Sequence, residues 1–173
     1  MVILVMSDSH SGLRFMRRCV ETIRPTDVVH LGDLIDDGKV MEEENPHIRF
    51  HLVPGNCDFY SRQTGQPQVL CYEVGGVRLF MTHGHLHGVK SGLDRLLADA
   101  REHGAQAVLF GHTHEALCYR EQDGLWVLNP GSCRSEEGSV GVIQIEDGKI
   151  SACSVRKQAD LEHWSGGGSC QDG

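Results

Sequence analysis

The chain has 173 residues, of which 39% are hydrophobic, 23% charged and 6% aromatic, and its 16 basic and 24 acidic side chains leave a net charge of −8. This composition is typical of one globular domain, and no apolar run approaches the roughly 18 residues of a membrane span. The acidic balance disfavours long nucleic acids as partners, because binding them requires clustered cations.

The cysteines are seven in number, scattered and without a CxxC pair: Cys19, Cys57, Cys71, Cys118, Cys133, Cys153 and Cys170. An odd, dispersed set is typical of reduced thiols and disfavours both a disulfide framework and a structural zinc site. The opening residues also lack the basic lead and small-residue cleavage site of a secretion signal. We therefore expect a cytoplasmic protein without a membrane partner.

Buried strands alternate with polar loops in the first third of the chain. The run VILVM is wholly apolar, which is typical of a strand covered on both faces. Apolar residues then recur at helical spacing until Pro25 stops the pattern. The expected elements are strands at 2–6, 28–31 and 48–53 and a helix at 13–23.

Antiparallel pairs dominate the second half. Gly75 and Gly76 separate two strand-like runs and predict a hairpin, and Gly104 predicts the end of a helix. The expected elements are strands at 69–74, 77–82, 107–110, 116–120, 126–128, 141–145 and 150–155 and a helix at 90–103. This order predicts an α/β domain of two packed sheets flanked by helices over residues 1–157, followed by a disordered tail at 158–173 whose last residues are rich in Gly and Ser.

Metal-competent side chains follow five of these strand-like runs: Asp8 and His10; Asp33; Asn56; His83; His112 and His114. In open α/β folds the loops at the carboxyl ends of strands converge at one edge of the sheet, so these seven can meet. Carboxylate, amide and imidazole donors together suit Mn, Fe, Co, Ni or Zn, whereas calcium prefers oxygen alone.

Seven ligands exceed the needs of one ion. If one carboxylate is shared, they divide into two sites, which is the two-metal arrangement of phosphate-ester hydrolases. Two divalent ions, the carboxylates of Asp8 and Asp33 and a bridging hydroxide sum to about +1, so the site would prefer an anionic substrate.

Five segments resemble, in order, the five motifs of the calcineurin-like metallophosphoesterase superfamily: Asp8-Ser9-His10, Gly32-Asp33, Gly55-Asn56-Cys57-Asp58, Thr82-His83-Gly84-His85 and Gly111-His112-Thr113-His114. The resemblance extends over residues 1 to about 157 and is greatest to the small bacterial and archaeal phosphodiesterases that are similar to the eukaryotic retromer subunit. The segment Asn129-Pro130-Gly131-Ser132 is also similar to one in that subgroup.

The resemblance implies a four-layer α/β/β/α sandwich of two mixed sheets flanked by helices. It implies that one ion is held by Asp8, His10 and His114, a second by Asn56, His83 and His112, and that Asp33 bridges them. The implied activity is metal-dependent hydrolysis of small phosphate diesters by in-line attack of a bridging hydroxide. We expect two divalent ions, with Mn²⁺ preferred and Zn, Ni, Fe and Co as alternatives.

Cys57 departs from the pattern, because most of the superfamily has His at this position, where it is thought to protonate the leaving oxygen. A thiol is a poorer hydrogen-bond donor than imidazolium, so we expect weak assistance to poor leaving groups. The sequence leaves two roles open for His85, contact with the substrate phosphate or support of neighbouring groups.

Other functions remain open from sequence. A phosphomonoesterase would use the same site, and a protein-interaction scaffold resembling the retromer subunit would retain the fold without activity. A nuclease is disfavoured because no basic groove is visible. The expected partner is a small phosphate ester, and a homo-oligomer is left open.

Several polar residues have simpler interpretations. His30 is expected to be a buried histidine with satisfied hydrogen bonds, Asn129 to hold a turn, and Asp36 and Asp37 to lie in a loop or support the site. The run 42–44 is expected to be a solvated acidic face, and 58–68 a loop that sets specificity. The remaining histidines are expected to be solvated: His47, His51, His87, His103 and His163.

Overall fold

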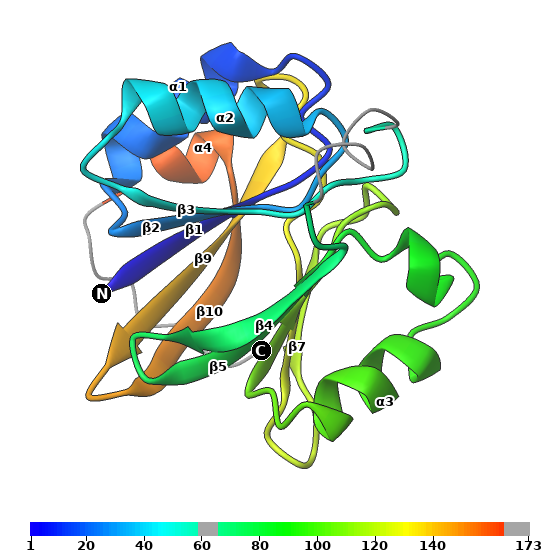
Figure 1. Ribbon diagram of the computed structural model, residues 1–173. Coiled ribbons are helices and arrows are strands. Elements are labelled where there is room, and N and C mark those ends of the chain that lie inside the picture. The colour runs from blue at the N-terminus through cyan, green and yellow to red at the C-terminus, as the bar shows by residue number, and fades with distance from the viewer. Residues whose placement is uncertain (59–65, 165–173) are drawn as a thin grey trace.

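The computed structural model describes residues 1–58 and 66–164. Two five-stranded sheets lie at its centre, with strand orders β10-β9-β1-β2-β3 and β4-β5-β6-β8-β7 (Figure 1). The first sheet contains β1 (Val2–Met6), β2 (Asp27–His30), β3 (Arg49–Leu52), β9 (Ser139–Glu146) and β10 (Lys149–Lys157). The second contains β4 (Val69–Val74), β5 (Val77–Thr82), β6 (Ala107–Leu109), β7 (Leu117–Arg120) and β8 (Trp126–Asn129).

Both sheets are mixed. Strands β1, β2 and β3 run parallel, with Val5 opposite Val29, while β9 joins β1 antiparallel. In the second sheet β5, β6 and β8 run parallel, and β4 and β7 close the two edges antiparallel. The carboxyl ends of β1, β2 and β3 therefore share one edge of their sheet, as do those of β5, β6 and β8.

Helices cover the outer faces of both sheets. On the first sheet lie α1 (Leu13–Ile23), α2 (Ile35–Glu44) and α4 (Gln158–Leu161), and on the second lies α3 (Asp94–Glu102) (Figure 1). The helix α1 buries Phe15 and Met16 against the first sheet, and α3 buries Leu96 against the second. The buried faces of the helices pack on the outer faces of the sheets and form a hydrophobic layer on each side of the molecule.

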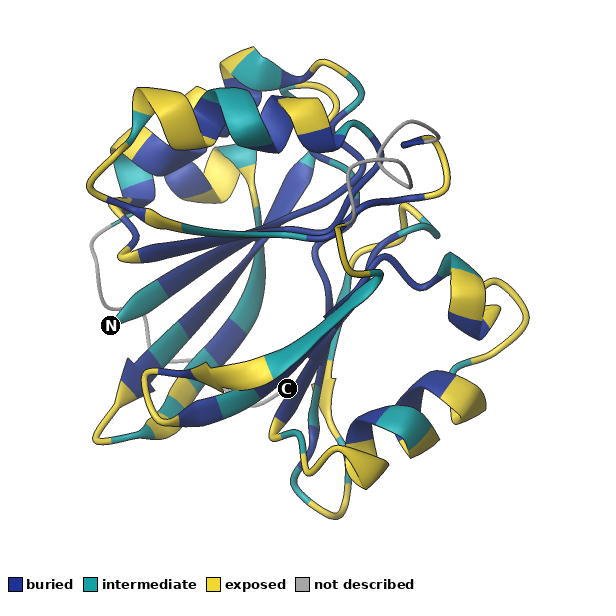
Figure 2. Ribbon diagram, in the orientation of Figure 1, coloured by how far each residue is buried: buried dark blue, intermediate teal, exposed yellow. Residues whose placement is uncertain are grey.

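The inner faces of the two sheets pack directly on each other. Val5 and Ile143 of the first sheet share one fully buried cluster with Leu79 and Leu128 of the second. Figure 2 shows the buried residues gathered along the strands, with the exposed residues on the outer turns of the helices and on the loops. Three apolar layers between four layers of structure make an α/β/β/α sandwich, so the expected fold class is confirmed.

Sequence reasoning missed one helix. Residues 36 and 37, expected in a loop, lie in the first turn of α2, where acidic residues favour the positive end of the helix dipole. The helix is hard to predict because Gly38 lies inside it, at a position where a Cβ would lie 2.8 Å from the Leu52 side chain. The acidic run 42–44 forms its exposed end, as expected for a solvated face.

Two boundaries differ by more than two residues from the expected ranges. Helix α3 begins at Asp94, four residues after the expected start at 90, because bends and turns occupy the preceding residues. Residues 158–164, assigned from sequence to the tail, include α4, whose Leu161 is buried in the same outer core as α1. The rest of the expected tail, 165–173, lies outside the described residues, as do residues 59–65 of the expected specificity loop.

No helix in the described ranges has both the length and the apolar character needed to cross a bilayer.

Candidate metal centre

The seven candidate ligands stand on loops that leave five parallel strands. Asp8 and His10 follow β1, Asp33 follows β2 and Asn56 follows β3. From the second sheet, His83 follows β5 directly, and His112 and His114 follow β6. The structure brings these loops together where the carboxyl ends of both sets of parallel strands meet.

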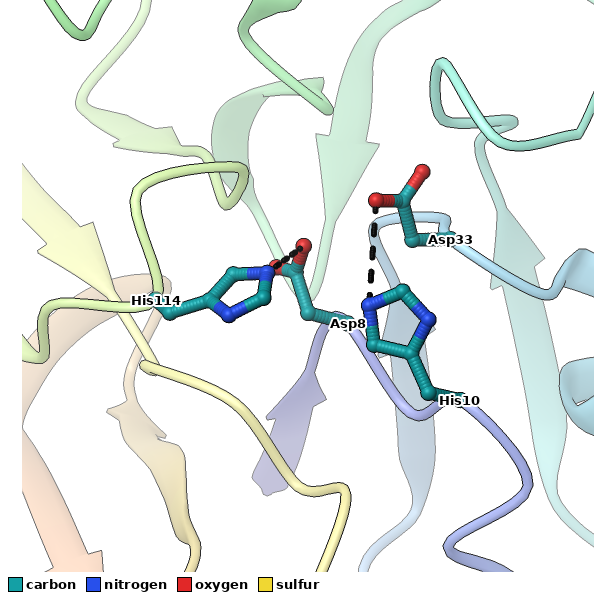
Figure 3. Close-up of side chains that lie close together, drawn as sticks. All are labelled: Asp8, His10, Asp33 and His114. Carbon is teal, nitrogen blue, oxygen red and sulfur yellow. Dashed lines mark ion pairs between the residues drawn. The ribbon is translucent and has the colours of Figure 1, made fainter.

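One group of ligand atoms combines Asp8, His10, Asp33 and His114, whose donor atoms all lie within 4.8 Å of one another (Figure 3). His114 Nε2 lies 3.0 Å from Asp8 Oδ1, and His10 Nε2 lies 3.9 Å from Asp33 Oδ2. Both carboxylates are buried, whereas His10 and His114 remain partly open to solvent. A small molecule can therefore approach this group from the side of the two imidazoles.

The second group combines Asp33, His83 and His112 within the same limit of 4.8 Å, and Asn56 joins it. His83 Nε2 lies 3.0 Å from Asn56 Oδ1, 3.2 Å from His112 Nδ1 and 3.5 Å from Asp33 Oδ1. Burial, and then the neighbouring His83 and Lys90, lower the pKa of His112 to about 4. At neutral pH its imidazole is therefore uncharged, which is the form that binds a cation.

Asp33 belongs to both groups and presents a different oxygen to each. Oδ1 faces His83 and also accepts the backbone N–H of Cys57 at 2.9 Å, while Oδ2 faces His10. Burial opposes ionisation of this carboxyl, but the Cys57 hydrogen bond and His83 outweigh it and hold the pKa below its usual value. Asp33 is therefore an anion placed between the two groups.

Several nitrogen and oxygen atoms with lone pairs face one another at this centre, and too few hydrogens lie between them to pair all of them in hydrogen bonds. His83 Nδ1 lies 2.7 Å from the carbonyl oxygen of Leu31, which can only accept a hydrogen bond, so the neutral tautomer that fits this contact has its proton on Nδ1 and a free lone pair on the Nε2 that faces Asn56 and Asp33. In the described chain, the buried Asp8 Oδ1 has no hydrogen-bond partner despite its closeness to His114. Such a donor set fits divalent cations, which would satisfy these lone pairs.

Backbone strain is concentrated at the same residues. Five of the seven candidate ligands are among the nine non-glycine residues with positive φ in the described chain: Asp8, His10, Asp33, His112 and His114. This backbone region is unfavourable for residues with a Cβ and costs of order 1–3 kcal/mol each. Packing alone does not require so many strained residues at one place, and this concentration is typical of a functional site.

Glycines allow the loops to approach one another. Gly32 has a φ of +98°, and a Cβ at this position would collide with the backbone of Gly55. A Cβ at Gly111 would collide with the Ser7 side chain and approach Asp8. Larger residues at these two positions would separate the loops that carry the candidate ligands.

Asp58 holds two of these loops, and four of the backbone N–H groups in the described part of the chain donate to it. Its carboxylate accepts Gly55 N–H at 2.7 Å, Asp33 N–H at 3.0 Å, Leu34 N–H at 3.0 Å and Ile35 N–H at 2.9 Å. Its position directly after Gly55-Asn56-Cys57 places it in the third motif, but spacing alone does not reveal these contacts. Asp58 acts on the centre by positioning Asp33.

Other polar groups fix the remaining loops. Asp37 accepts hydrogen bonds from Ser9 Oγ at 2.7 Å and from Ser11 N–H at 2.8 Å. It therefore supports the site, which is one of the two roles that the sequence leaves open for it. Asn129 accepts Gly131 N–H in the expected turn, and it also donates to Gly111 and Thr113 of the loop that carries His112 and His114. These contacts link loops that are far apart in the sequence.

Cys57 and His85 border the centre. Burial, followed by the Asp33 carboxylate, raises the pKa of the Cys57 thiol, which therefore stays protonated at neutral pH. The ring of His85 lies 5.3 Å from that of His83 and 6.1 Å from that of His112, measured between centroids. Both residues therefore lie beside the candidate ligands, Cys57 next to Asp33 and His85 next to His83 and His112.

Two histidines expected in solvent are not solvated. His87 is buried and lies 2.9 Å from Asp99, with its ring edge-on to Phe80. His51 contacts Tyr72 at 2.6 Å and the buried Asp27 at 3.1 Å. Residues distant in sequence supply these partners, so a single-sequence pattern does not reveal them. His47, His103 and His163 are exposed, as expected.

His30 is fully buried and hydrogen-bonded, as expected. Its Nδ1 accepts Gly32 N–H, and its Nε2 lies 3.1 Å from Ser9 Oγ. Burial lowers its pKa to about 4.

Acid should destabilise the metal-free protein through His30. Between about pH 6.5 and 4 the unfolded chain binds a proton that the folded His30 does not, so the unfolding free energy falls as pH falls. The expected loss is about 3 kcal/mol over this window. Urea unfolding at successive pH values should show a shallower dependence for His30→Gln, whereas the exposed control His47→Gln should retain the wild-type slope. Equal slopes for all three would contradict the assignment.

The sequence is similar to a known protein family and to two groups of relatives. The profile of the calcineurin-like phosphoesterase superfamily domain matches residues 1–148. The chain is 33% identical over 138 residues to a probable metallophosphoesterase of Bacillus subtilis, which covers 78% of this chain and 76% of the relative. It is 28% identical over 153 residues to vacuolar protein sorting-associated protein 29 of Schizosaccharomyces pombe, with 85% of this chain and 78% of that protein covered.

Solved structures agree with the fold. A conserved protein from Streptococcus pneumoniae, described as a predicted phosphoesterase, superposes with a TM-score of 0.71 at 29% identity and covers 91% of this chain and 90% of its own. Vacuolar protein sorting protein 29 of Entamoeba histolytica, solved in complex with Zn²⁺, gives a TM-score of 0.70 at 22% identity, with 90% and 97% covered. The second likeness concerns the fold alone.

Proposed function

This chain belongs to the calcineurin-like phosphoesterase superfamily, and from that premise we propose that it is a metal-dependent phosphodiesterase acting on small phosphate diesters. The observation that carries the proposal is the pair of ligand groups that share Asp33. Asp8, His10 and His114 would hold one divalent ion, and Asn56, His83 and His112 the other. Bound ions would polarise the phosphoryl group and lower the pKa of the attacking water.

The protein's own residues have distinct tasks in this proposal. Asp33, kept ionised, is the shared carboxylate. Asp8 is oriented by Ser7 Oγ and His112 N–H, which both donate to Oδ2 and leave Oδ1 for a cation. Cys57 and His85 contact the phosphate oxygens, the thiol as a hydrogen-bond donor because it is protonated. Mn²⁺ is the proposed ion.

The exposure of the first ligand group to solvent supports a diester substrate. A diester carries two organic groups on one phosphorus and needs open space on both sides of the reacting atom. The His10 and His114 side chains, which border the first group, are 26% and 47% exposed. With two carboxylates among seven ligands, two divalent ions leave a net positive centre, which favours a phosphate anion.

The first test measures the hydrolysis of bis-p-nitrophenyl phosphate and p-nitrophenyl phosphate by metal-stripped protein, with and without Mn²⁺. We expect Mn²⁺-dependent turnover that is faster with the diester. His83→Ala should lose this turnover because it removes a nitrogen from the second ligand group, whereas the exposed control His47→Ala should retain it.

Each other outcome has a definite meaning. Faster hydrolysis of the monoester would replace the proposal with a phosphomonoesterase at the same site. No turnover of either ester with any divalent ion, by protein that circular dichroism shows to be folded, would favour a scaffold like the vacuolar sorting relative. The complete set of seven ligands argues against a decayed site.

Cys57 should make the reaction sensitive to the leaving group. Because a thiol is a weak general acid, kcat/KM should fall steeply from aryl to alkyl diesters. We expect Cys57→His to raise kcat/KM for alkyl diesters about 10-fold or more and to make kcat/KM depend less on the leaving group. Cys57→Ala should change kcat/KM for alkyl diesters little. A flat dependence in the wild type, or a loss of about 100-fold on alkyl diesters in Cys57→Ala, would contradict weak thiol assistance.

A further inference from the structure

Two thiols face each other in the space between the sheets. Cys118 lies in β7 of the second sheet, Cys153 lies in β10 of the first, and their Sγ atoms are 3.3 Å apart. Cα atoms of these two strands come within 8 Å of each other. A disulfide has an S–S distance of about 2.05 Å, so the sulfurs need to approach by roughly 1.2 Å. Side-chain rotation can supply a movement of this size.

The two thiols differ in their access to solvent. Cys153 is 4% exposed within the core between the sheets, whereas Cys118 is half-buried and packs on the outside of that core. The hydrogen bond with Cys153 lowers the pKa of Cys118, although burial opposes this shift. Cys118 is therefore the thiol that a small reagent in solution reaches first.

We propose that Cys118 and Cys153 are a modification site, a thiol pair that low-molecular-weight disulfides such as oxidised glutathione convert to a reversible disulfide joining the two sheets. The observation that carries the proposal is the contact of the two sulfurs across the sandwich. It is independent of the phosphodiesterase activity.

The reaction proceeds by two exchanges. The Cys118 thiolate attacks one sulfur of oxidised glutathione, breaks its S–S bond and releases one glutathione thiolate, leaving a mixed disulfide. Cys153 then attacks the Cys118 sulfur and expels the second glutathione thiolate, which takes up the Cys153 proton. The protein thiols lose two electrons and two protons in total, and oxidised glutathione gains them as two thiols.

The bridge would restrain the loop that carries His112 and His114. Strand β7 begins three residues after His114, and Cys118 pairs with Leu128 of β8. The next residue, Asn129, donates to Gly111 and Thr113 of the same loop. A covalent bond from Cys118 to the first sheet therefore fixes one end of a segment that borders the candidate metal centre.

Peptide mapping tests the proposal on the full-length protein. The protein is equilibrated with increasing ratios of oxidised to reduced glutathione, alkylated and digested with trypsin without reduction. The tryptic peptides 102–120 and 150–156 each contain one cysteine. We expect them to appear joined, with a mass two hydrogens below their sum, and to separate with dithiothreitol. The Tm of the oxidised protein should rise on the order of 5–10 °C.

Variants distinguish a resolving pair from two independent thiols. Cys153→Ala should trap glutathione on Cys118, and Cys118→Ser should leave Cys153 unmodified because it is buried. Cys71→Ser, on strand β4 of the same sheet as Cys118, is the matched control and should form the bridge as the wild type does. Glutathione that persists on wild-type Cys118, no reaction at all, or linkage of Cys118 to another cysteine would overturn the proposal.

Discussion

Replacing Asp33 with asparagine should lower kcat/KM for bis-p-nitrophenyl phosphate about 10³-fold and reduce the amount of bound metal. Asp33 is the one residue common to both groups of candidate ligands, with Oδ1 3.5 Å from His83 Nε2 and Oδ2 3.9 Å from His10 Nε2. Asparagine keeps the size of the side chain but is neutral, and it offers an oxygen to one group only. The other group would face an NH₂ that cannot bind a cation.

The measurement combines steady-state kinetics with metal content after dialysis against Mn²⁺. Asp36→Asn is the matched control, because Asp36 lies three residues later, is exposed in α2 and pairs with Lys39. It should retain activity and metal content. If Asp33→Asn retained full metal content and activity within tenfold of the wild type, Asp33 would not be the shared ligand.

Replacing Asp58 with asparagine should lower both stability and metal affinity. Within residues 1–58 and 66–164, the carboxylate accepts four backbone N–H groups, two on each oxygen: Asp33 and Gly55 on Oδ2, Leu34 and Ile35 on Oδ1. In asparagine one of these oxygens becomes an NH₂ group that faces two donors. We expect the unfolding free energy to fall by about 3 kcal/mol, because hydrogen bonds to a buried carboxylate are lost and two N–H groups remain unsatisfied.

The effect of Asp58 on activity should pass through Asp33. We expect kcat/KM at low Mn²⁺ to fall 10- to 100-fold, on the order of the losses seen when residues behind metal ligands are changed, and to recover in part at high Mn²⁺. Urea unfolding and Mn²⁺ titration of activity measure the two effects. Asp94→Asn, an exposed aspartate in the first turn of α3, is the control and should change neither by much. A stability loss without any change in the Mn²⁺ requirement would show that Asp58 serves the fold alone.

The periodicity of apolar residues and the turn residues predict several elements of the fold correctly. The apolar run at 2–6 is β1, the helical spacing at 13–23 is α1, and the two glycines at 75 and 76 join β4 to β5 as expected. These elements are short-range features, in which side chains a few residues apart determine the local structure. Helix α2 was missed because Gly38 and its acidic residues obscure the apolar stripe.

The residues that have the chemistry of a metal centre can be identified from the sequence alone, because carboxylate, amide and imidazole groups follow the strand-like runs and an α/β fold gathers the ends of its parallel strands. How these groups meet is visible only in the three-dimensional structure. It turns the two oxygens of Asp33 toward different groups, directs the Asp58 carboxylate to four backbone donors, and brings Cys118 within 3.3 Å of Cys153, which lies 35 residues away. Such contacts depend on how sheets and loops pack in space, and residue spacing along one chain does not contain that information.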